Sequence, residues 1–332
     1  MIEISVASGK GGVGKSLLAA HLALLLSRRW RLIAVDADAE APNMHIVLGV
    51  KEWDKVLEHH EGRRAFILQD KCTRCGICME ACQFGAIRIM GGKYIVDKWL
   101  CEGCYTCSLV CPVKAIRFER DVLAGWIRVE EKTRWGFPLV SAEIIPGRPN
   151  SGKLVTEARN TGRTIDTNAD LMILDSAAGI GCQVIASLAG SHAAILVAEP
   201  TRASISDLKR IIKLVQHFRI PSMLVVNKYD LNIELYEEIL GIARENKIYV
   251  LGRIPYDENV PRSYVAMKPL VEYSPGSPAA RALVEIADRL DEVLSGFDEW
   301  RLEYLPEAYK PFTPIVIRPG ESLGQPNMLT RW

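Results

Sequence analysis

The sequence predicts an α/β fold: a mostly parallel sheet covered by helices on both faces, into which a smaller α+β unit is inserted. Two observations predict the larger unit, namely short runs of continuously apolar residues and helical segments that alternate with them. Strands that are apolar along their whole length are typical of parallel sheets buried on both faces. The third observation concerns the cysteines. Eight of the nine lie within residues 66–119, where the alternation is interrupted.

The alternation begins at the amino terminus with a predicted strand over residues 2–7, a helix over 15–29 and a second strand over 32–36. It resumes after the cysteine-rich stretch with helices that include 203–218 and 233–245. The strands predicted there are Leu171–Asp175, Ala193–Ala198, Met223–Asn227 and Ile248–Ile254. Between the two halves, residues 126–166 are predicted to form strands and loops, with a loop at 147–152.

These patterns predict a chain organised in four parts. Residues 1–60 and 121–295 form the two parts of the larger domain, and residues 61–120 form the insert. Residues 296–332 are predicted to form an extended carboxy-terminal tail. Five prolines from Pro306 onward favour an extended arm, because proline removes a backbone donor that a helix needs.

The charge balance gives no field of one sign that would attract nucleic acid or an anionic membrane, because 41 basic side chains face 40 acidic ones. We therefore expect neither as a partner. Residues 1–6 enter a strand directly, without the segments of a signal peptide, and no apolar run reaches the roughly 18 residues of a membrane span. Nine cysteines without an export signal favour metal or redox chemistry in a reducing compartment. We expect a cytoplasmic protein.

A glycine-rich segment, Ser8-Gly-Lys-Gly-Gly-Val-Gly-Lys-Ser16, follows the first predicted strand and opens the first helix. In this context backbone N–H groups and the helix N-terminus converge on phosphate groups. Lys15 is predicted to reach the β- and γ-phosphates, and Ser16 to ligate Mg²⁺. The nucleotide-binding residues predicted here are Gly9, Gly11, Gly12, Val13, Gly14, Lys15, Ser16 and Leu17.

The additional lysine of this segment, Lys10, creates the pattern Lys-Gly-Gly-x-Gly-Lys-Ser. This pattern resembles the deviant Walker A motif of the P-loop ATPase superfamily that includes MinD, ParA, the Mrp-type proteins and the nitrogenase iron protein. The resemblance implies a homodimer in which Lys10 reaches the nucleotide bound by the other subunit. It also implies that Lys10, Lys15 and Asp38 are catalytic.

Two acidic segments resemble the switch regions of the same superfamily. Asp36-Ala-Asp38 ends the second predicted strand, and Leu171-Met-Ile-Leu-Asp175-Ser-Ala-Ala-Gly179 resembles a Walker B motif that continues into switch II. The resemblance implies that Asp38 orients the attacking water, while Asp36 and Asp175 join Ser16 around Mg²⁺. Ordinary aspartates at strand ends are the alternative.

Two further segments resemble the part of the site that holds the base. Asn227 ends a predicted strand and resembles the base-reading asparagine, while Pro255 and Asp257 lie in a segment that resembles the loop over the adenine. An asparagine that only caps the following turn is the alternative for Asn227. The expected ligands of the larger domain are therefore ATP or ADP together with Mg²⁺.

The insert contains two cysteine runs of equal spacing, Cys-x2-Cys-x2-Cys-x3-Cys, each followed by Ala-Ile-Arg and a short predicted strand. This internal repeat is typical of ferredoxins with two [4Fe–4S] clusters, in which the fourth cysteine of each run ligates the other cluster. One predicted ligand set is Cys72, Cys75, Cys78 and Cys111, and the other is Cys101, Cys104, Cys107 and Cys82. Zinc ribbons, which also use Cys-x2-Cys pairs, are the alternative.

The ninth cysteine, Cys182, lies seven residues after Asp175. A cysteine at this spacing in the nitrogenase iron protein helps to hold a cluster between two subunits, but its expected second cysteine is missing from residues 134–149. Two interpretations remain open for Cys182: a buried or interfacial thiol, or a thiolate that binds a transient cluster or metal across the dimer. The pair His59-His60 is predicted to lie on a solvated face.

Together the motifs resemble MinD-superfamily ATPases that carry an inserted ferredoxin domain, over roughly residues 1–295. The resemblance implies that nucleotide-dependent dimerisation, with switches reset by hydrolysis, gates electron transfer from the two clusters to a partner. A protein electron donor or acceptor is then expected. One alternative is an ATP-dependent carrier or assembly factor that delivers clusters to client proteins. The other is a ParA-type positioning ATPase with a redox sensor.

Overall fold

The structure is a computed structural model that describes residues 1–120, 122–148 and 151–307. Within these ranges one large sheet has nine strands in the order β13-β12-β11-β1-β10-β2-β9-β8-β3. Neighbours from β13 to β9 pair in parallel, which confirms the predicted mostly parallel sheet, whereas β8 and β3 add an antiparallel extension. The strands are β1 (Ile2–Ser8), β2 (Leu32–Ala37), β3 (Lys55–His60), β8 (Leu123–Glu130), β9 (Leu139–Ile144), β10 (Leu171–Ala178), β11 (Ala193–Ala198), β12 (Ser222–Asn227) and β13 (Tyr249–Ile254).

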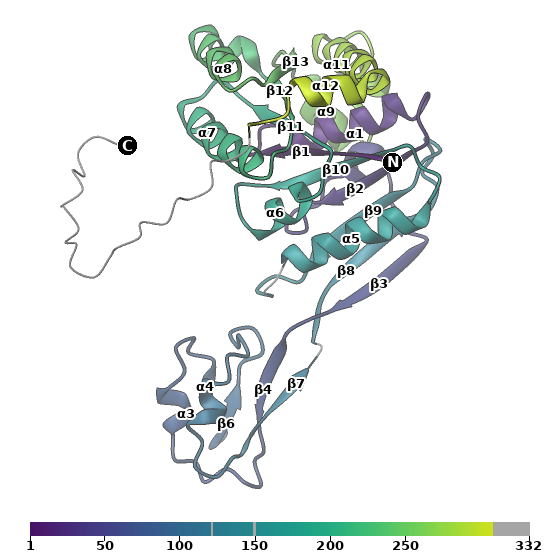
Figure 1. The fold of residues 1–332 in the computed structure, drawn as a ribbon. Helices are drawn as coiled ribbons and strands as arrows, with labels where there is room; N and C mark the ends of the chain where they lie inside the picture. Colours follow the sequence, from purple (N-terminus) through teal and green to yellow (C-terminus); the bar gives the residue numbers. More distant parts are fainter. Residues whose placement is uncertain (121, 149–150, 308–332) are drawn as a thin grey trace, which may run out of the picture.

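Helices bury both faces of this sheet because successive residues of a strand point to opposite sides. In β10, Leu171 and Ile173 pack in the core beneath α1 and α11, whereas Met172 and Leu174 pack beneath α5 (Figure 1). The helices of the larger unit are α1 (Lys15–Leu26), α2 (Met44–Leu48), α5 (Ser151–Ile165), α6 (Cys182–Leu188), α7 (Arg202–His217), α8 (Ile233–Glu245), α9 (Asn259–Val265), α10 (Leu270–Tyr273), α11 (Pro278–Ser295) and α12 (Phe297–Glu303), with a 3₁₀ turn η1 (Tyr229–Leu231). None of the helices in the described ranges is both long and apolar enough to span a bilayer.

The cysteine-rich insert extends from the antiparallel edge of the sheet (Figure 1). The chain leaves β3 at His60 and returns into β8 at Leu123. Between these points lie two antiparallel pairs, β4 with β7 and β5 with β6, and two one-turn helices. Their bounds are β4 (Arg63–Ile67), α3 (Ile77–Glu80), β5 (Ile87–Met90), β6 (Lys93–Val96), α4 (Thr106–Leu109) and β7 (Ile116–Arg120). As predicted, each Ala-Ile-Arg segment leads into a strand.

Two stretches fold differently from the prediction. Helix α5 (Ser151–Ile165) occupies residues predicted as strand and loop, and it buries Leu154, Val155 and Ala158 against the sheet. Helix α12 (Phe297–Glu303) lies within the predicted extended tail, because Phe297 and Trp300 form an apolar face that packs on the core around α11. The prolines of the tail begin only after α12, and residues 308–332 lie outside the described part of the chain.

The predicted solvated face at the end of β3 was wrong for His59, which is only 3% exposed. Its ring nitrogens Nδ1 and Nε2 contact the carboxylates of Glu157 and Glu61, and Glu61 also lies 3.4 Å from Lys153 Nζ. Glu157 and Lys153 belong to α5, which therefore covers the point where the chain enters the insert. His60 on the opposite side of the strand is exposed.

Candidate functional site

A cavity of about 970 Å³ opens beyond the carboxyl ends of β1, β2, β10 and β12. This volume lies at the upper end of the range for small-molecule sites, roughly 300–1,000 Å³. The glycine-rich segment contributes one wall, and the loops after β2 and β10 contribute others. The residues of the glycine-rich segment that line the cavity are Gly11, Gly12, Gly14, Lys15, Ser16 and Leu17.

The glycine-rich segment owes its shape to backbone conformations that favour glycine. Gly12 and Gly14 have φ of 77° and 97°, in the left-handed region. Gly14 also lies so close to β12 that a Cβ there would come within 2.4 Å of the side-chain nitrogen of Asn227. Of the predicted binding residues, Gly9 and Val13 are not among those that line the cavity: Gly9 packs against the backbone of Asp207 in α7, and the side chain of Val13 is buried in the core.

Asn227 is buried, and both ends of its amide are bound within the protein although it lines the cavity. Its side-chain nitrogen donates to the carbonyl oxygen of Val13 at 2.8 Å, and its side-chain oxygen accepts from the backbone N–H of Lys228 at 2.9 Å. Asn227 thus links β12 to the glycine-rich segment through its side-chain hydrogen bonds.

Lys10 is not among the residues that line the cavity of its own chain. Its Nζ lies 2.8 Å from one carboxylate oxygen of Glu199, whose other oxygen lies 3.2 Å from Lys228 Nζ. The hydrogen bond that Lys10 donates to Glu199 raises the pKa of Lys10 above its ordinary value. Because Glu199 follows β11 directly, Lys10 is held at the rim of the sheet.

Asp36 and Asp175 face each other across the pairing of β2 with β10, and both are fully buried. Asp36 accepts hydrogen bonds from the backbone N–H groups of Asp38 and Met44, at 3.2 and 2.9 Å. Within the described ranges, neither carboxylate oxygen of Asp175 has a hydrogen-bond partner. Burial raises the pKa of Asp36 well above its ordinary value, and the charge of Asp175 adds to this shift.

Burial also raises the pKa of Asp175, to about 7, while Lys15 opposes this shift. A buried carboxylate with two unbound oxygens is suited to a hard cation, which takes oxygen ligands. The predicted Mg²⁺ ligands Ser16, Asp36 and Asp175 therefore fit the ion chemically. Asp38 lines the cavity, and burial raises its pKa against the opposing charge of Lys15.

The loop after β13 contributes an apolar wall, but through residues other than the two predicted ones. Pro255 and Asp257 do not line the cavity, whereas Tyr256 between them does, together with Val260, Pro261 and Tyr264. Asp257 instead orders the loop, since its carboxylate accepts from the backbone N–H groups of Asn259 and Ala279 at 2.9 and 3.2 Å. The segment from Pro255 to the end of α9 therefore borders the cavity, and the packing shows which of its side chains face inward.

Two smaller cavities lie in the insert, and each is lined by four cysteines. In both, three cysteines come from one run and the fourth comes from the other run. The first cavity has Cys72, Cys75, Cys78 and Cys111, and the second has Cys101, Cys104, Cys107 and Cys82. The structure thus brings together the two predicted groups of four.

The chemistry of these cavities can be compared with the needs of a cluster. All nine cysteines are free of disulfides. Burial raises the pKa of Cys107 to about 11, and the neighbouring Cys101 and Cys104 add to this shift, so ionising all the thiols together requires a compensating cation. Backbone N–H groups of Ala65, Ala86 and Ala115 lie 3.4, 3.4 and 3.2 Å from the sulfurs of Cys101, Cys82 and Cys111.

Hydrogen bonds of this kind accompany cysteine sulfurs at iron–sulfur clusters. Among the described residues, no group of three or more His, Cys, Asp or Glu side chains is arranged to hold a single metal ion. A cubane binds its four cysteines through four different iron atoms, so it needs a wider cage than one ion does. By residue type and grouping, the two sets of cysteines fit [4Fe–4S] clusters.

Cys182 is exposed, lines the cavity at the glycine-rich segment and begins α6. The first turn of α5 lies against it, because a Cβ at Gly152 would come within 3.1 Å of the Cys182 carbonyl oxygen. Helices α5 and α6 are thus packed together next to the cavity.

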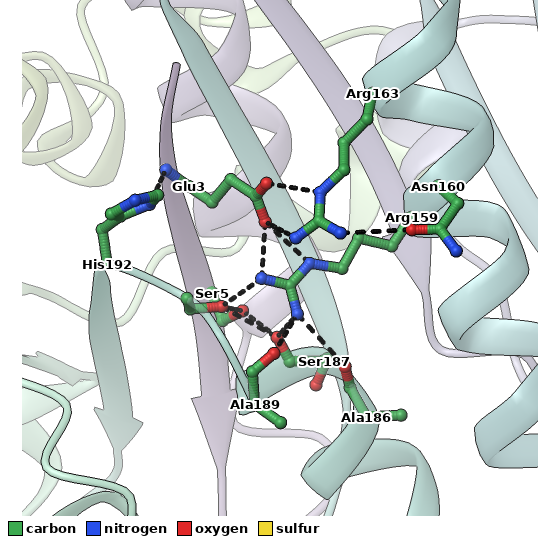
Figure 2. Close-up of polar contacts among 10 residues, drawn as sticks. Glu3, Ser5, Arg159, Asn160, Arg163, Ala186, Ser187, Ala189 and His192 are labelled. Carbon is green, nitrogen blue, oxygen red and sulfur yellow. Dashed lines mark hydrogen bonds and ion pairs between the residues drawn. The ribbon is translucent and has the colours of Figure 1, made fainter.

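A buried ion-pair network joins the same two helices below the sheet (Figure 2). Glu3 of β1 binds Arg159 Nε and Arg163 Nε of α5, each at 2.7 Å. Arg159 also donates to the carbonyl oxygens of Ala186 and Ser187 at 3.3 and 3.4 Å, at the carboxyl end of α6. Although burial alone would raise it, the two guanidinium groups hold the pKa of Glu3 below its ordinary value. The carboxyl end of α6 is anchored while its amino end faces the cavity.

Comparison with known proteins agrees with this geometry. The profile of the CobQ/CobB/MinD/ParA nucleotide binding domain matches residues 4–270. The chain belongs to this family. An uncharacterized protein of Methanocaldococcus jannaschii is 32% identical over 300 residues, which cover 89% of this chain and 98% of that protein.

Two further proteins are similar to this chain. An iron-sulfur cluster carrier protein of Pyrococcus horikoshii is 23% identical over 303 residues, covering 87% of this chain and 85% of that protein. The fold is similar to that of the septum site-determining protein MinD from the same organism, whose structure was solved with Mg-ADP. That similarity has a TM-score of 0.56 at 18% identity and covers 89% of this chain and 98% of the other.

Proposed function

We propose that this family member binds and hydrolyses ATP with Mg²⁺, and that nucleotide-dependent pairing of two subunits gates electron transfer from two [4Fe–4S] clusters to a protein partner. Ser16, Asp36 and Asp175 would hold the Mg²⁺. When bound, the clusters supply one-electron chemistry. The observation that carries the proposal is that eight cysteines are divided four and four around two cavities in a chain that also forms a glycine-rich nucleotide cavity.

Residues 145–148 and α5 support the coupling between the two sites. Gly147 lies near Trp99 of the insert, since a Cβ added to Gly147 would be 3.7 Å from the Trp99 carbonyl oxygen. The guanidinium carbon of Arg148 lies 6.0 Å from the centre of the Trp99 ring. Helix α5 begins at Ser151, and its Gly152 lies against Cys182 at the nucleotide cavity. A shift of the amino end of α6 on nucleotide exchange would therefore reach the insert through α5.

The position of Lys10 supports the pairing of subunits. Its side chain is 38% exposed, its ammonium group is bound to Glu199 at the rim of the sheet, and it is not among the residues that line the cavity of its own chain. An exposed ion pair contributes little net free energy. On pairing, Lys10 would give up its contact with Glu199 and bind the phosphates of the nucleotide in the other subunit.

The first test replaces Lys10 with alanine and measures ATP hydrolysis and nucleotide-dependent dimerisation by light scattering. We expect both to be lost, while Lys213→Ala, an exposed lysine of α7, retains both. Full hydrolysis and dimerisation by Lys10→Ala would contradict the proposal.

The second test addresses the coupling. Anaerobic redox titration of the two clusters by electron paramagnetic resonance is compared in ATP, in ADP and without nucleotide. We expect the nucleotide to change the potential or line shape of at least one cluster. Spectra and potentials that are the same in all three states would rule out coupling within one chain.

A second candidate function is delivery of clusters to client proteins. It is favoured by the relative from Pyrococcus horikoshii that is named an iron-sulfur cluster carrier protein. A carrier transfers iron and sulfide to an apo-ferredoxin acceptor in an ATP-dependent way, whereas an electron-transfer protein keeps both clusters through many turnovers. Iron analysis of donor and acceptor after separation distinguishes the two functions.

A further inference from the structure

The two cysteine runs of the insert repeat the same backbone, including positions in the left-handed region. Arg74 and Gly103 stand immediately before the second cysteine of their runs, with φ of 61° and 62°. Lys114 and Gly85 stand three residues after the last cysteine, with φ of 49° and 60°. In this second pair, each backbone N–H donates to the carbonyl oxygen of that last cysteine. At both positions, therefore, one copy of the repeat has glycine and the other has a long cation.

The two cations occupy a conformation that is costly for them. Glycine adopts the left-handed region without a steric penalty, whereas a residue with a Cβ is strained there. The copies with Gly103 and Gly85 show that the same loops form with glycine. Strained residues persist where their side chains have a role that offsets the strain. We therefore expect a role for the charged groups of Arg74 and Lys114.

Both cations belong to the cavity that is lined by Cys72, Cys75, Cys78 and Cys111. Arg74 lines this cavity, and Lys114 follows Val113, which also lines it. Of the described residues that line it, Arg74 is the only charged one besides the cysteines, whereas in the other cysteine cavity that residue is Glu102. The two cavities thus carry charges of opposite sign in their walls.

The cations are also free to meet a partner. Arg74 and Lys114 are exposed, and neither side chain forms a hydrogen bond or ion pair within residues 1–120, 122–148 and 151–307. Two apolar side chains of the same part of the insert, Ile77 and Val113, are 42% and 39% exposed. Arg74 precedes α3 and Lys114 follows α4, and these helices lie away from the connecting strands β4 and β7 (Figure 1). An apolar centre with a charged rim is typical of a protein interface.

We propose that the surface formed by Arg74, Ile77, Val113 and Lys114 docks an acidic protein, which exchanges one electron with the cluster at the adjoining cysteines. This inference rests on the proposed electron-transfer function and names the face and the kind of partner. Cations on this surface attract carboxylates of the partner and so raise the rate of association. In the transfer, the reduced cluster loses one electron and the redox centre of the docked protein gains it.

The charge of the whole insert favours the same kind of partner. Residues 61–120 carry ten basic and six acidic side chains, whereas the rest of the chain carries 31 basic and 34 acidic ones. The near-zero net charge of the chain therefore conceals a basic insert attached to a slightly acidic larger unit. An acidic partner is attracted to the insert and not to the larger unit.

The test uses the double variant Arg74→Gly with Lys114→Gly, because glycine already stands at both counterpart positions. The chain with both clusters is reduced with dithionite, desalted and mixed with flavodoxin, a small acidic electron-transfer protein, in a stopped-flow instrument. At low ionic strength we expect the double variant to reduce flavodoxin about tenfold more slowly than the wild type, and the difference to vanish near about 0.5 M salt, because salt screens the charges. The rate with cytochrome c, a basic acceptor, should not fall.

Three controls separate docking from other effects. Arg74→Lys with Lys114→Arg keeps both charges and should keep the wild-type rate. Glu102→Gln changes the charge at the other cavity and should not slow the reduction of flavodoxin. Redox titration of the double variant measures the third effect: loss of positive charge lowers the potential of the nearby cluster and increases the driving force towards both acceptors. A slower rate with flavodoxin alone therefore reports docking.

Three outcomes would overturn this inference and leave the proposed function intact. The first is an equal rate with flavodoxin in the wild type and the double variant, both with full iron content. The second is an equal fall with cytochrome c, which would assign the effect to the cluster itself. The third is loss of nucleotide-dependent dimerisation in the double variant, which would mean that the second subunit covers this surface. A wild-type chain that binds no iron after reconstitution would overturn both this inference and the proposed function.

Discussion

The larger unit and the insert hold their functional residues in different ways. The larger unit has cores on both faces of its sheet, with residues such as Leu18 and Ile33 fully buried. The apolar cluster of the insert has only four buried residues, Ala65, Ile87, Cys107 and Ile116, against which cysteines pack. Its surface exposes large apolar side chains such as Leu109 and Met90. We therefore expect the larger unit to be stable without its ligand, and the insert to depend on the proposed clusters.

The largest expected effect tests this dependence directly. Cys107→Ala removes a proposed cluster ligand and one of the four core residues, so we expect loss of iron and of hydrogen-exchange protection throughout residues 61–120. The larger unit should keep its protection and its affinity for ADP. Ser108→Ala, in the same helix α4, should retain both iron and protection. Full hydrogen-exchange protection of residues 61–120 in a variant without iron would contradict this difference between the insert and the larger unit.

The next effect is confined to the larger unit. Arg159→Met removes one of the two guanidinium partners of the buried Glu3 carboxylate, and it leaves the carbonyl oxygens at the end of α6 without their donor. We therefore expect the free energy of unfolding to fall by about 3–5 kcal/mol. Arg163→Met removes a more exposed partner of Glu3 and should cost less. Denaturant unfolding followed by circular dichroism measures both, and equal effects would contradict the assigned roles.

A third effect is the pH dependence of the larger unit. His21 is fully buried, donates to the Leu17 carbonyl oxygen at 2.7 Å and accepts from the Leu270 N–H at 2.8 Å. Burial lowers its pKa to about 4, although the hydrogen bond to Leu17 opposes this.

Because the unfolded chain binds this proton more readily, stability is complete above about pH 6.5 and falls as the pH decreases towards 4. The loss contributed by His21 reaches about 3 kcal/mol. Urea unfolding of wild type and His21→Gln at several pH values measures it. A pH slope that is equal in the two proteins would contradict the assignment.

The smallest effect tests the contact between the two regions. Arg148 places a positive charge near Trp99 and Cys101, and a positive charge favours the more negative, reduced form of a cluster. We expect Arg148→Met to lower the potential of one of the two clusters, while Arg148→Lys largely retains it and Lys209→Met in α7 has no effect. Redox titration by electron paramagnetic resonance measures the shift. Unchanged potentials in Arg148→Met would mean that the charge of Arg148 affects neither cluster.

Much of this protein could be predicted from local sequence patterns. The glycine-rich segment, the buried strands and the Cys-x2-Cys-x2-Cys-x3-Cys runs are each defined by residues close together in the chain. Spacing within such a segment determines which backbone groups and sulfurs can converge. Helix α5 was missed because Pro149 and Gly152 at its start indicate a loop. The apolar residues of α5 stabilise the helix only when they pack on the sheet, which is formed by strands distant in the sequence.

What the sequence by itself determined is the chemical content of the two sites: a phosphate-binding loop, strand-end carboxylates and two sets of four cysteines. Only the tertiary structure decided the contacts between distant segments, such as Gln183 with Glu40, Asn227 with Val13, and Lys10 with Glu199. Each of these contacts depends on the order of strands in the sheet, which no local pattern encodes. The position of α5 is decided in the same way, since it packs on α6 beside the cavity and on β8, the strand that follows the insert.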